Sequence, residues 1–289
     1  MGFRQALTGL PLFFVRLMSL MVKLLLTLLD TYGSIYPNEG KENVMKYRLT
    51  DETISWEGHL LHRIQATKDF GNVKAGDLGG FVENGKNLSH DGNAWVYDDA
   101  WIYGDEARVW GNARVYDKAR VGGNADVYGN AKVHGEAQVY GLARVYGDAR
   151  VYDQAWVSDN ANVHGNAQVF GKAWVYDNAR VFGEACVCDN AWVYGNAWVS
   201  DNAQIYNNAT VFDKANICDN ARVYDEANVY GSTKVFGKAW VYGNARVFGY
   251  AWVCDNARVF DKANVYGIAR VYGSMKVCGS TEVCREAHC

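Results

Sequence analysis

Histidine is the side chain best suited to acid–base catalysis, and this 289-residue chain contains six. His134 and His164 are the catalytic candidates, because both lie in the most regular part of the chain. A general base needs partners that position it, and none can be identified for either residue. The remaining histidines are isolated in the sequence, at His59, His62, His90 and His288. We therefore expect His134 and His164 to replace aromatic residues at the surface rather than to catalyse a reaction.

Cysteine is the other reactive residue type, and the chain contains seven, an odd number. Their spacing is not that of a small disulfide-bonded domain, so we expect a reducing compartment. Cys186 and Cys188 are two positions apart, which would place both thiols on one outward face of a strand. A metal would need further ligands from neighbouring strands, where Trp and Tyr occupy most positions. We therefore predict tolerated, partly buried thiols, and no metal or cofactor.

A six-residue repeat must position all of these side chains. It runs without a gap from Glu106 to Arg285, with Val or Ile at residue 109 and at every sixth position after it. Ala lies two residues before each, except at Thr233, Met275 and Thr281. This alternation predicts a short strand in each hexad, with Ala and Val facing inward. The second position after each Val or Ile is almost always Gly, Asp or Asn, which tolerate left-handed backbone angles and so predict a corner.

Strands this short require stacking. If the chain turns at every hexad, three hexads close one triangular coil, and thirty hexads give about ten coils. The predicted fold is therefore all-β: a single-stranded, left-handed parallel β-helix. The repeat begins weakly at Ala94–Val96, and one extra residue near Asp105 and Glu106 resets its register.

Aromatic residues give the predicted rod its most informative surface. Trp156, Trp174 and Trp192 occupy the same position in three successive coils, so they should form a ladder on one face. A longer ladder on the same face includes the binding candidates Tyr176, Tyr194 and Tyr230. Stacked rings stabilise a sheet, but such a face could also bind sugar rings or a protein. Arg114, Lys132 and Arg150 predict a basic run on another face, continued by Arg222, Arg258 and Lys276, which corner aspartates should partly neutralise.

The chain divides into three regions by composition. Residues 1–44 are apolar and could form a membrane-associated helix, although Arg16 and Lys23 would be costly in hydrocarbon; alternatively Met45 is the true start. Residues 45–92 lack the repeat and predict a β-hairpin cap, with strand-like runs at Thr53–Trp56 and Leu60–Ala66. Residues 93–289 form the repeat domain.

Charge and chain ends limit the partners. The net charge of −3 creates no basic field for nucleic acid. The repeat continues to the last residues without a recognisable cap, and an uncovered coil invites end-to-end pairing. We expect self-association, as a trimer or end to end, and membrane association only if residues 1–44 are translated.

The hexad phrase, Val-x-x-x-Ala-x, resembles the hexapeptide-repeat, left-handed β-helix superfamily. The order Lys46–Leu49, Asp69–Phe70, Val73–Gly76 and Gly79–Gly80 is similar to the start of YdcK-like bacterial and prophage proteins, labelled putative transferases or polymer-forming proteins. The superfamily's acyltransferases imply a catalytic histidine near loops that meet a neighbour in a trimer, and its carbonic anhydrases imply three histidine zinc ligands. This chain has neither the loops nor the ligand set. The resemblance implies a bacterial or phage-related, cytoplasmic protein.

Three functions remain open from the sequence. The leading hypothesis is a non-enzymatic structural or interaction protein, a β-helical rod serving as scaffold, spacer or polymer subunit. The second is an acyl-CoA-dependent transferase that would use His134 or His164. The third is a carbohydrate-binding module that uses the aromatic face.

Overall fold

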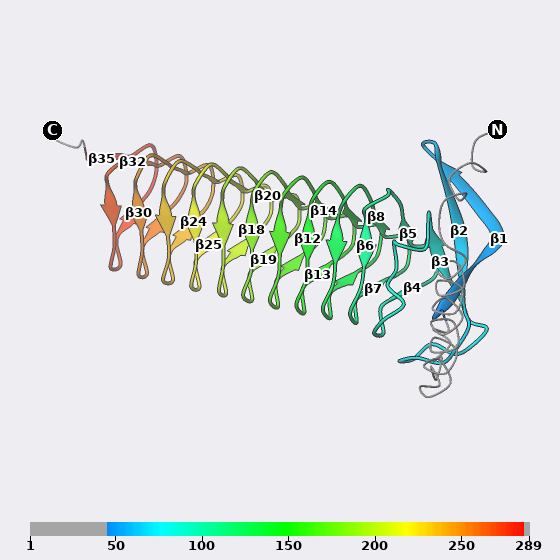
Figure 1. Ribbon diagram of the computed structural model, residues 1–289. Helices are drawn as coiled ribbons and strands as arrows, with labels where there is room; N and C mark the ends of the chain where they lie inside the picture. Colours follow the sequence, from blue (N-terminus) through cyan, green and yellow to red (C-terminus); the bar gives the residue numbers. More distant parts are fainter. Residues whose placement is uncertain (1–44, 286–289) are drawn as a thin grey trace, which may run out of the picture. The chain divides into compact units, whose positions relative to one another are not determined.

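The computed structural model describes residues 45–285 as a coil of stacked turns that begins at a β-hairpin (Figure 1). The chain divides after Val44 into two units, and the predictions for residues 1–44, His288 and Cys289 lie outside the described residues. Within residues 45–285 every regular element is a strand, and no helix long and apolar enough to cross a membrane occurs there. The all-β, parallel β-solenoid prediction is confirmed.

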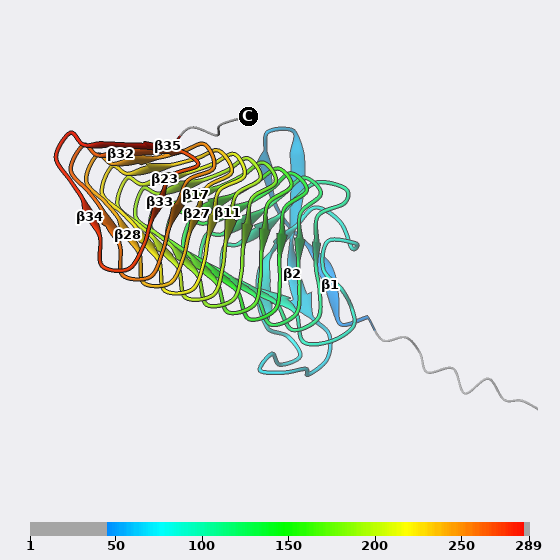
Figure 2. The same cartoon turned by 90° about the vertical axis from the view of Figure 1, so that its left-hand side faces the viewer.

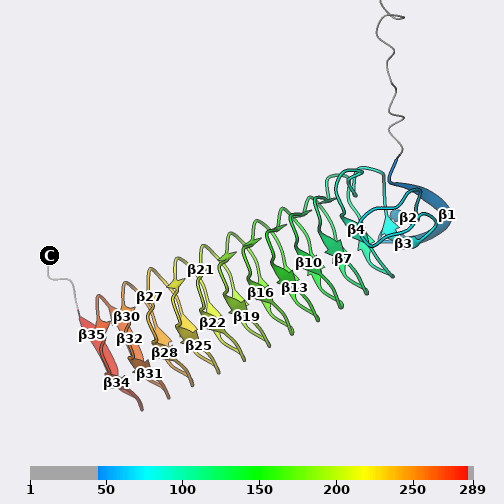
Figure 3. The same ribbon diagram turned by 90° about the horizontal axis from the view of Figure 1, so that it is seen from below.

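Three sheets run along the axis of the coil in residues 45–285, with 14, 11 and 10 strands. Figure 3 shows the strands of the 11-stranded sheet following one another along this axis. The 14-stranded sheet contains, in spatial order, β1 (Tyr47–Trp56), β2 (His59–Ala66), β3 (Leu78–Val82), β5 (Trp101–Ile102), β8 (Arg120–Val121), β11 (Gln138–Val139), β14 (Trp156–Val157), β17 (Trp174–Val175), β20 (Trp192–Val193), β23 (Thr210–Val211), β26 (Asn228–Val229), β29 (Arg246–Val247), β32 (Asn264–Gly267) and β35 (Glu282–Arg285).

The other two sheets contain only two-residue strands. The 11-stranded sheet consists of β4 (Trp95–Val96), β7 (Arg114–Val115), β10 (Lys132–Val133), β13 (Arg150–Val151), β16 (Gln168–Val169), β19 (Cys186–Val187), β22 (Gln204–Ile205), β25 (Arg222–Val223), β28 (Trp240–Val241), β31 (Arg258–Val259) and β34 (Lys276–Val277). The 10-stranded sheet consists of β6 (Arg108–Val109), β9 (Asp126–Val127), β12 (Arg144–Val145), β15 (Asn162–Val163), β18 (Arg180–Val181), β21 (Trp198–Val199), β24 (Asn216–Ile217), β27 (Lys234–Val235), β30 (Trp252–Val253) and β33 (Arg270–Val271).

The hexad alternation builds the core. Ala113 and Val115 are fully buried, and the same two columns repeat along the coil. Figure 2 shows the backbone of the coils stacked turn over turn. Each strand of the repeat pairs in parallel with the strand one coil later: Arg114 N donates to Ala131 O at 2.9 Å, and Tyr116 N donates to Val133 O at 3.0 Å. A buried valine contributes about 1.5–3 kcal/mol, so the stack supplies the stability that a two-residue strand lacks.

The predicted corners have left-handed backbone angles. Gly111 has φ 70°, Asp117 has φ 59° and Asn207 has φ 57°. The predicted register change is also confirmed, because the step from Trp101 to its partner Arg120 is one position longer than the step from Arg120 to Gln138. One extra residue near Asp105 is therefore absorbed without breaking the sheet.

The predicted hairpin cap is confirmed, and its strands are longer than expected. β1 and β2 pair antiparallel around Glu57 and Gly58, with a bulge between Leu49 and Thr53. β2 pairs antiparallel with β3, and β3 pairs in parallel with β5, so the cap continues the 14-stranded sheet. The alternation predicts Trp95 to face outward, but it is 1% exposed because the rings of Tyr47 and Phe70 pack against it.

Candidate functional site

The outer face of the 14-stranded sheet carries the candidate functional site, which begins beside the cap. Arg120, on β8, packs against two neighbouring indoles: its Cζ atom is 4.6 Å from the ring centroids of both Trp56 and Trp101. Trp56 comes from β1 and Trp101 from β5, with their centroids 5.5 Å apart. Cation–π contacts of this kind contribute about 0.5–2 kcal/mol each, so this cluster attaches the cap to the first coils.

A second arginine organises the same end of the face. The Cζ atom of Arg63, on β2, lies 4.3 Å from the ring centroid of Phe81, and its Nε atom donates to Glu52 Oε1 at 2.8 Å. Its Nη2 atom is 3.3 Å from Asp99 Oδ1, and Nη1 donates to Gly79 O at 2.9 Å. Paired charges and aromatic rings therefore line a depression of about 440 Å³, which also includes Lys118 and Arg120.

The depression continues along the rod as an open groove, which we call the ladder groove. It has a volume of about 530 Å³ and shares Lys118 and Arg120 with the depression beside the cap. Its remaining lining residues are Glu136, Gln138, Gln154, Trp156, Lys172 and Trp174. The groove thus combines indole rings with amides, a carboxylate and ammonium groups, which suits a polar partner with apolar patches.

The predicted tryptophan ladder is present on this face. Trp156 and Trp174 stack with centroids 4.7 Å apart, and Trp174 and Trp192 stack at 5.5 Å, with planes 11° and 13° from parallel. Both faces of the Trp174 ring are therefore covered by its neighbours. Trp192, at the end of the ladder, is 44% exposed and is followed along the sheet by the smaller Thr210.

The longer ladder also lies beside this face. Tyr176, Tyr194, Phe212 and Tyr230 stack in sequence at 4.8–5.0 Å, and the stack continues through Phe248 to Tyr266. Its rings are half-buried, because each covers the next. Burial, followed by the nearby Tyr194, raises the pKa of Tyr176 to about 12. The Tyr176 phenol is therefore a packing group that stays protonated at neutral pH.

The catalytic candidates His134 and His164 lie in similar ladders on the other two sheets. His134 stacks between Tyr116 and Tyr152, with centroids at 4.5 and 5.0 Å. Burial lowers its pKa, against the opposing effect of Asp117, whose Oδ2 atom is 3.8 Å from His134 Nδ1. The structure does not bring the two histidines together.

His164 has comparable surroundings in the 10-stranded sheet. It stacks between Tyr146 and Phe182 at 4.7 and 5.1 Å. Burial, with a smaller effect from Arg180, lowers its pKa. Ring stacking therefore occupies both faces of each imidazole, as expected for aromatic replacements.

The basic run is present on the 11-stranded sheet, where Arg114, Lys132 and Arg150 are neighbours along β7, β10 and β13. Among the described residues, the corner aspartates beside it do not form ion pairs with the run. Asp117 and Asp153 instead accept hydrogen bonds from the backbone of the next corner. The expected neutralisation is therefore at most a longer-range effect.

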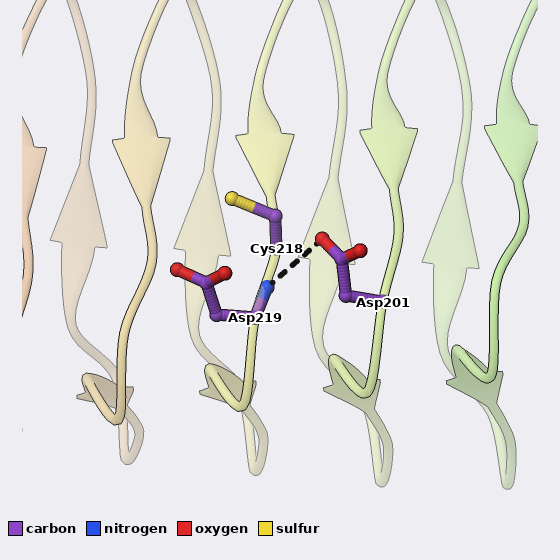
Figure 4. A group of neighbouring side chains, drawn as sticks. All are labelled: Asp201, Cys218 and Asp219. Atoms are coloured by element: carbon purple, nitrogen blue, oxygen red, sulfur yellow. Dashed lines mark hydrogen bonds between the residues drawn. The ribbon is translucent and has the colours of Figure 1, made fainter.

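One group of metal-ligand type was not predicted from the sequence. Asp201, Cys218 and Asp219 have ligand atoms within 4.8 Å of one another (Figure 4). Asp201 Oδ2 already accepts hydrogen bonds from Asp219 N at 3.3 Å and from Ser200 Oγ at 3.0 Å, and Asp219 Oδ2 accepts one from Gly237 N at 2.9 Å. The spacing of one coil between Asp201 and Asp219 is the sequence feature that could have predicted their proximity. Their hydrogen bonds to the backbone and to Ser200 explain the cluster as part of the corners, without a metal ion.

Comparison with protein families agrees with this architecture. Four segments match the YdcK beta solenoid repeat, at residues 107–123, 143–159, 203–216 and 239–255. Each segment begins at a buried alanine of a hexad, so the matches follow the structural register. No curated protein matches the chain. The chain is thus a β-solenoid repeat protein.

Proposed function

We propose that this chain is a non-enzymatic structural and interaction protein, a rigid β-solenoid rod that serves as a scaffold, spacer or polymer subunit. The observation that carries the proposal is the uninterrupted turning of the described chain at every hexad from Ala107 to Arg285. An acyltransferase-type site needs projecting loops to enclose its substrate, and this part of the chain contributes only tight corners.

The bonding pattern supports a mechanical role. Every coil in the regular part donates backbone hydrogen bonds to the next one, and the Ala and Val columns form one continuous core. Such a stack transmits force and keeps its ends at a fixed separation, because no flexible linker interrupts it. The ladder groove would then be the contact surface of the rod.

Particle shape and self-association test this proposal on the full-length protein. Electron microscopy and sedimentation velocity should show extended particles, and sedimentation equilibrium should show concentration-dependent association, as a trimer or end to end. A rod that remains monomeric at every concentration would contradict the polymer version. Compact particles would contradict the proposal in every version.

The transferase alternative has its own test. Calorimetric titration with acetyl-CoA should give no binding heat. Saturable binding of acetyl-CoA would favour a transferase if at least one of the variants His134→Ala and His164→Ala loses it. That result would overturn the non-enzymatic proposal. Loss in the control Tyr116→Ala as well would assign the effect to the stack rather than to an imidazole.

Carbohydrate binding is a second candidate function, because the ladder groove places Gln138 and Gln154 beside Trp156. Amides and indoles are the groups that recognise sugar hydroxyls and sugar ring faces. Stacking covers the inner indole faces, so a sugar ring would have to bind at the ends of the ladder. A glycan array tests carbohydrate binding by the ladder groove. The wild type is compared with Trp156→Ala and with the control Trp240→Ala, which lies on the 11-stranded sheet. A binding signal lost only in Trp156→Ala supports the candidate function, and no signal in the wild type excludes it.

A further inference from the structure

Two cysteines on the 11-stranded sheet form a feature that the rod itself does not require. Cys186 is the outward residue of β19, and Cys188 follows the inward Val187. The strand alternation therefore turns both thiols to the same outer face. Both are half-buried.

The neighbours of the pair differ from the sequence-based expectation. Gln168 and Gln204 flank Cys186 on the adjacent strands, where Trp and Tyr were expected to predominate. Cys186 therefore has polar amide groups on both sides along the sheet. An amide carbonyl oxygen can accept hydrogen bonds or complete a coordination shell, whereas a stacked ring cannot.

Cys188 interrupts an aromatic ladder. Tyr152 stacks on Phe170 before this position, and Tyr206 stacks on Tyr224 after it. Phe170 and Tyr206 are two coil steps apart, roughly 10 Å at the usual spacing of stacked strands. The Cys188 thiol occupies the position where a ring would otherwise fill this interval, so it lies in a notch between two rings, beside Cys186.

A corner carboxylate is hydrogen-bonded to one of the two thiols. The Cys188 thiol donates to Asp189 Oδ2 at 3.9 Å. The same carboxylate oxygen accepts a hydrogen bond from Asn207 N at 3.1 Å. The carboxylate is thus held by the corner, and the two sulfur atoms are the soft donors.

We propose that Cys186 and Cys188 form a bidentate site for a thiophilic metal or metalloid ion. Two adjacent sulfur donors suit ions that accept two or three soft ligands, such as copper(I) or trivalent arsenic, whereas zinc requires four ligands. For a monovalent ion, two thiols and one ion give a bis-thiolate complex with two metal–sulfur bonds and release two protons to solvent. No oxidation state changes.

The test uses phenylarsonous acid, which binds two adjacent thiols and releases two water molecules. The protein is the full-length chain with the three C-terminal cysteines replaced, as Cys278→Ser, Cys284→Ser and Cys289→Ser, so that they cannot form a competing pair. Native mass spectrometry should show one adduct per chain. Cys186→Ser and Cys188→Ser should each abolish it, and the isolated thiols give the matched controls Cys218→Ser and Cys254→Ser, which should retain it.

Serine should not disturb the fold at either position. Ser158 and Ser200 occupy the position equivalent to Cys188 in the other two sheets, and Thr210 carries a hydroxyl at the position equivalent to Cys186. Circular dichroism checks this. A protection experiment needs no variant at the site: bound arsenical should protect Cys186 and Cys188 together from alkylation by iodoacetamide. A copper(I) titration in competition with bicinchoninate should show at least tenfold weaker copper(I) binding in Cys186→Ser. Absence of an adduct, its retention in Cys186→Ser, or its equal loss in Cys254→Ser would overturn the proposal.

Discussion

The Asp117 carboxylate accepts a hydrogen bond from the backbone nitrogen of Gly135, one coil further along the rod, at 2.9 Å. The same contact recurs at other corners, including Asp213 to Gly231 at 3.1 Å and Asp261 to Gly279 at 3.0 Å. Aspartate therefore does more at a corner than tolerate a left-handed backbone angle. It connects its corner to the next one.

This contact predicts different effects for two substitutions at one corner. Asp117→Ala loses the hydrogen bond and keeps the strained φ, so we expect it to destabilise the protein by about 1–3 kcal/mol. Asp117→Gly also loses the bond, but it relieves the strain and should cost less. Urea denaturation measures both, with the adjacent Lys118→Ala as control. Equal losses for Ala and Gly would show that strain contributes nothing at this corner.

Glycine corners make the converse prediction. A Cβ atom added to Gly135, at φ 69°, would lie 2.8 Å from Asp153 N. Aspartate corners have smaller φ values, between 52° and 60°. Gly135→Asp should adopt that geometry and accept a hydrogen bond from Asp153 N, whereas Gly135→Ala gains nothing in return. We expect the alanine variant to have the lower melting temperature, by several degrees. The opposite order would contradict the proposed role of the carboxylate.

The six-residue period predicts the features that recur in every coil. The contacts made by the cap, which has no period, were found only in the structure. Val115, the corner at Asp117 and the Trp156–Trp174 stack all follow from the hexad and from the closing of each coil by three hexads. The contact of Arg120 with Trp56 does not, because Trp56 belongs to the cap, which has no period. The burial of Trp95 was missed for the same reason: the cap covers a face that the alternation assigns to solvent.

Thr233 is a repeat residue that departs from its column. It is fully buried in an alanine column, and among the described residues its Oγ1 is the buried side-chain oxygen that lacks a hydrogen-bond partner. Thr233→Val keeps the shape and removes the hydroxyl, so it should stabilise the protein by about 1–2 kcal/mol. Thr210→Val, in an outward column, is the control and should change little. Chemical denaturation decides, and a destabilised Thr233→Val would mean that the hydroxyl is satisfied in solution.

Lys46 makes the stability of the cap depend on pH. It is 1% exposed, and its Nζ atom donates to Ala94 O at 2.9 Å and lies 4.9 Å from the ring centroid of Phe70. Burial, opposed by the charge of Asp91, lowers its pKa to about 8 from 10.5. Between these two values the unfolded chain binds more protons than the folded one, so stability should rise with pH.

We expect a gain on the order of 1 kcal/mol between pH 7.5 and 9.5 in the wild type, relative to Lys46→Met. In that variant the titrating group is absent, so this part of the pH dependence should disappear. Lys86→Met, at an exposed position of the same cap, should retain the wild-type slope. Urea denaturation at the two pH values measures the difference. Parallel pH profiles for the wild type and Lys46→Met would mean that the ammonium group stays solvated in the folded cap.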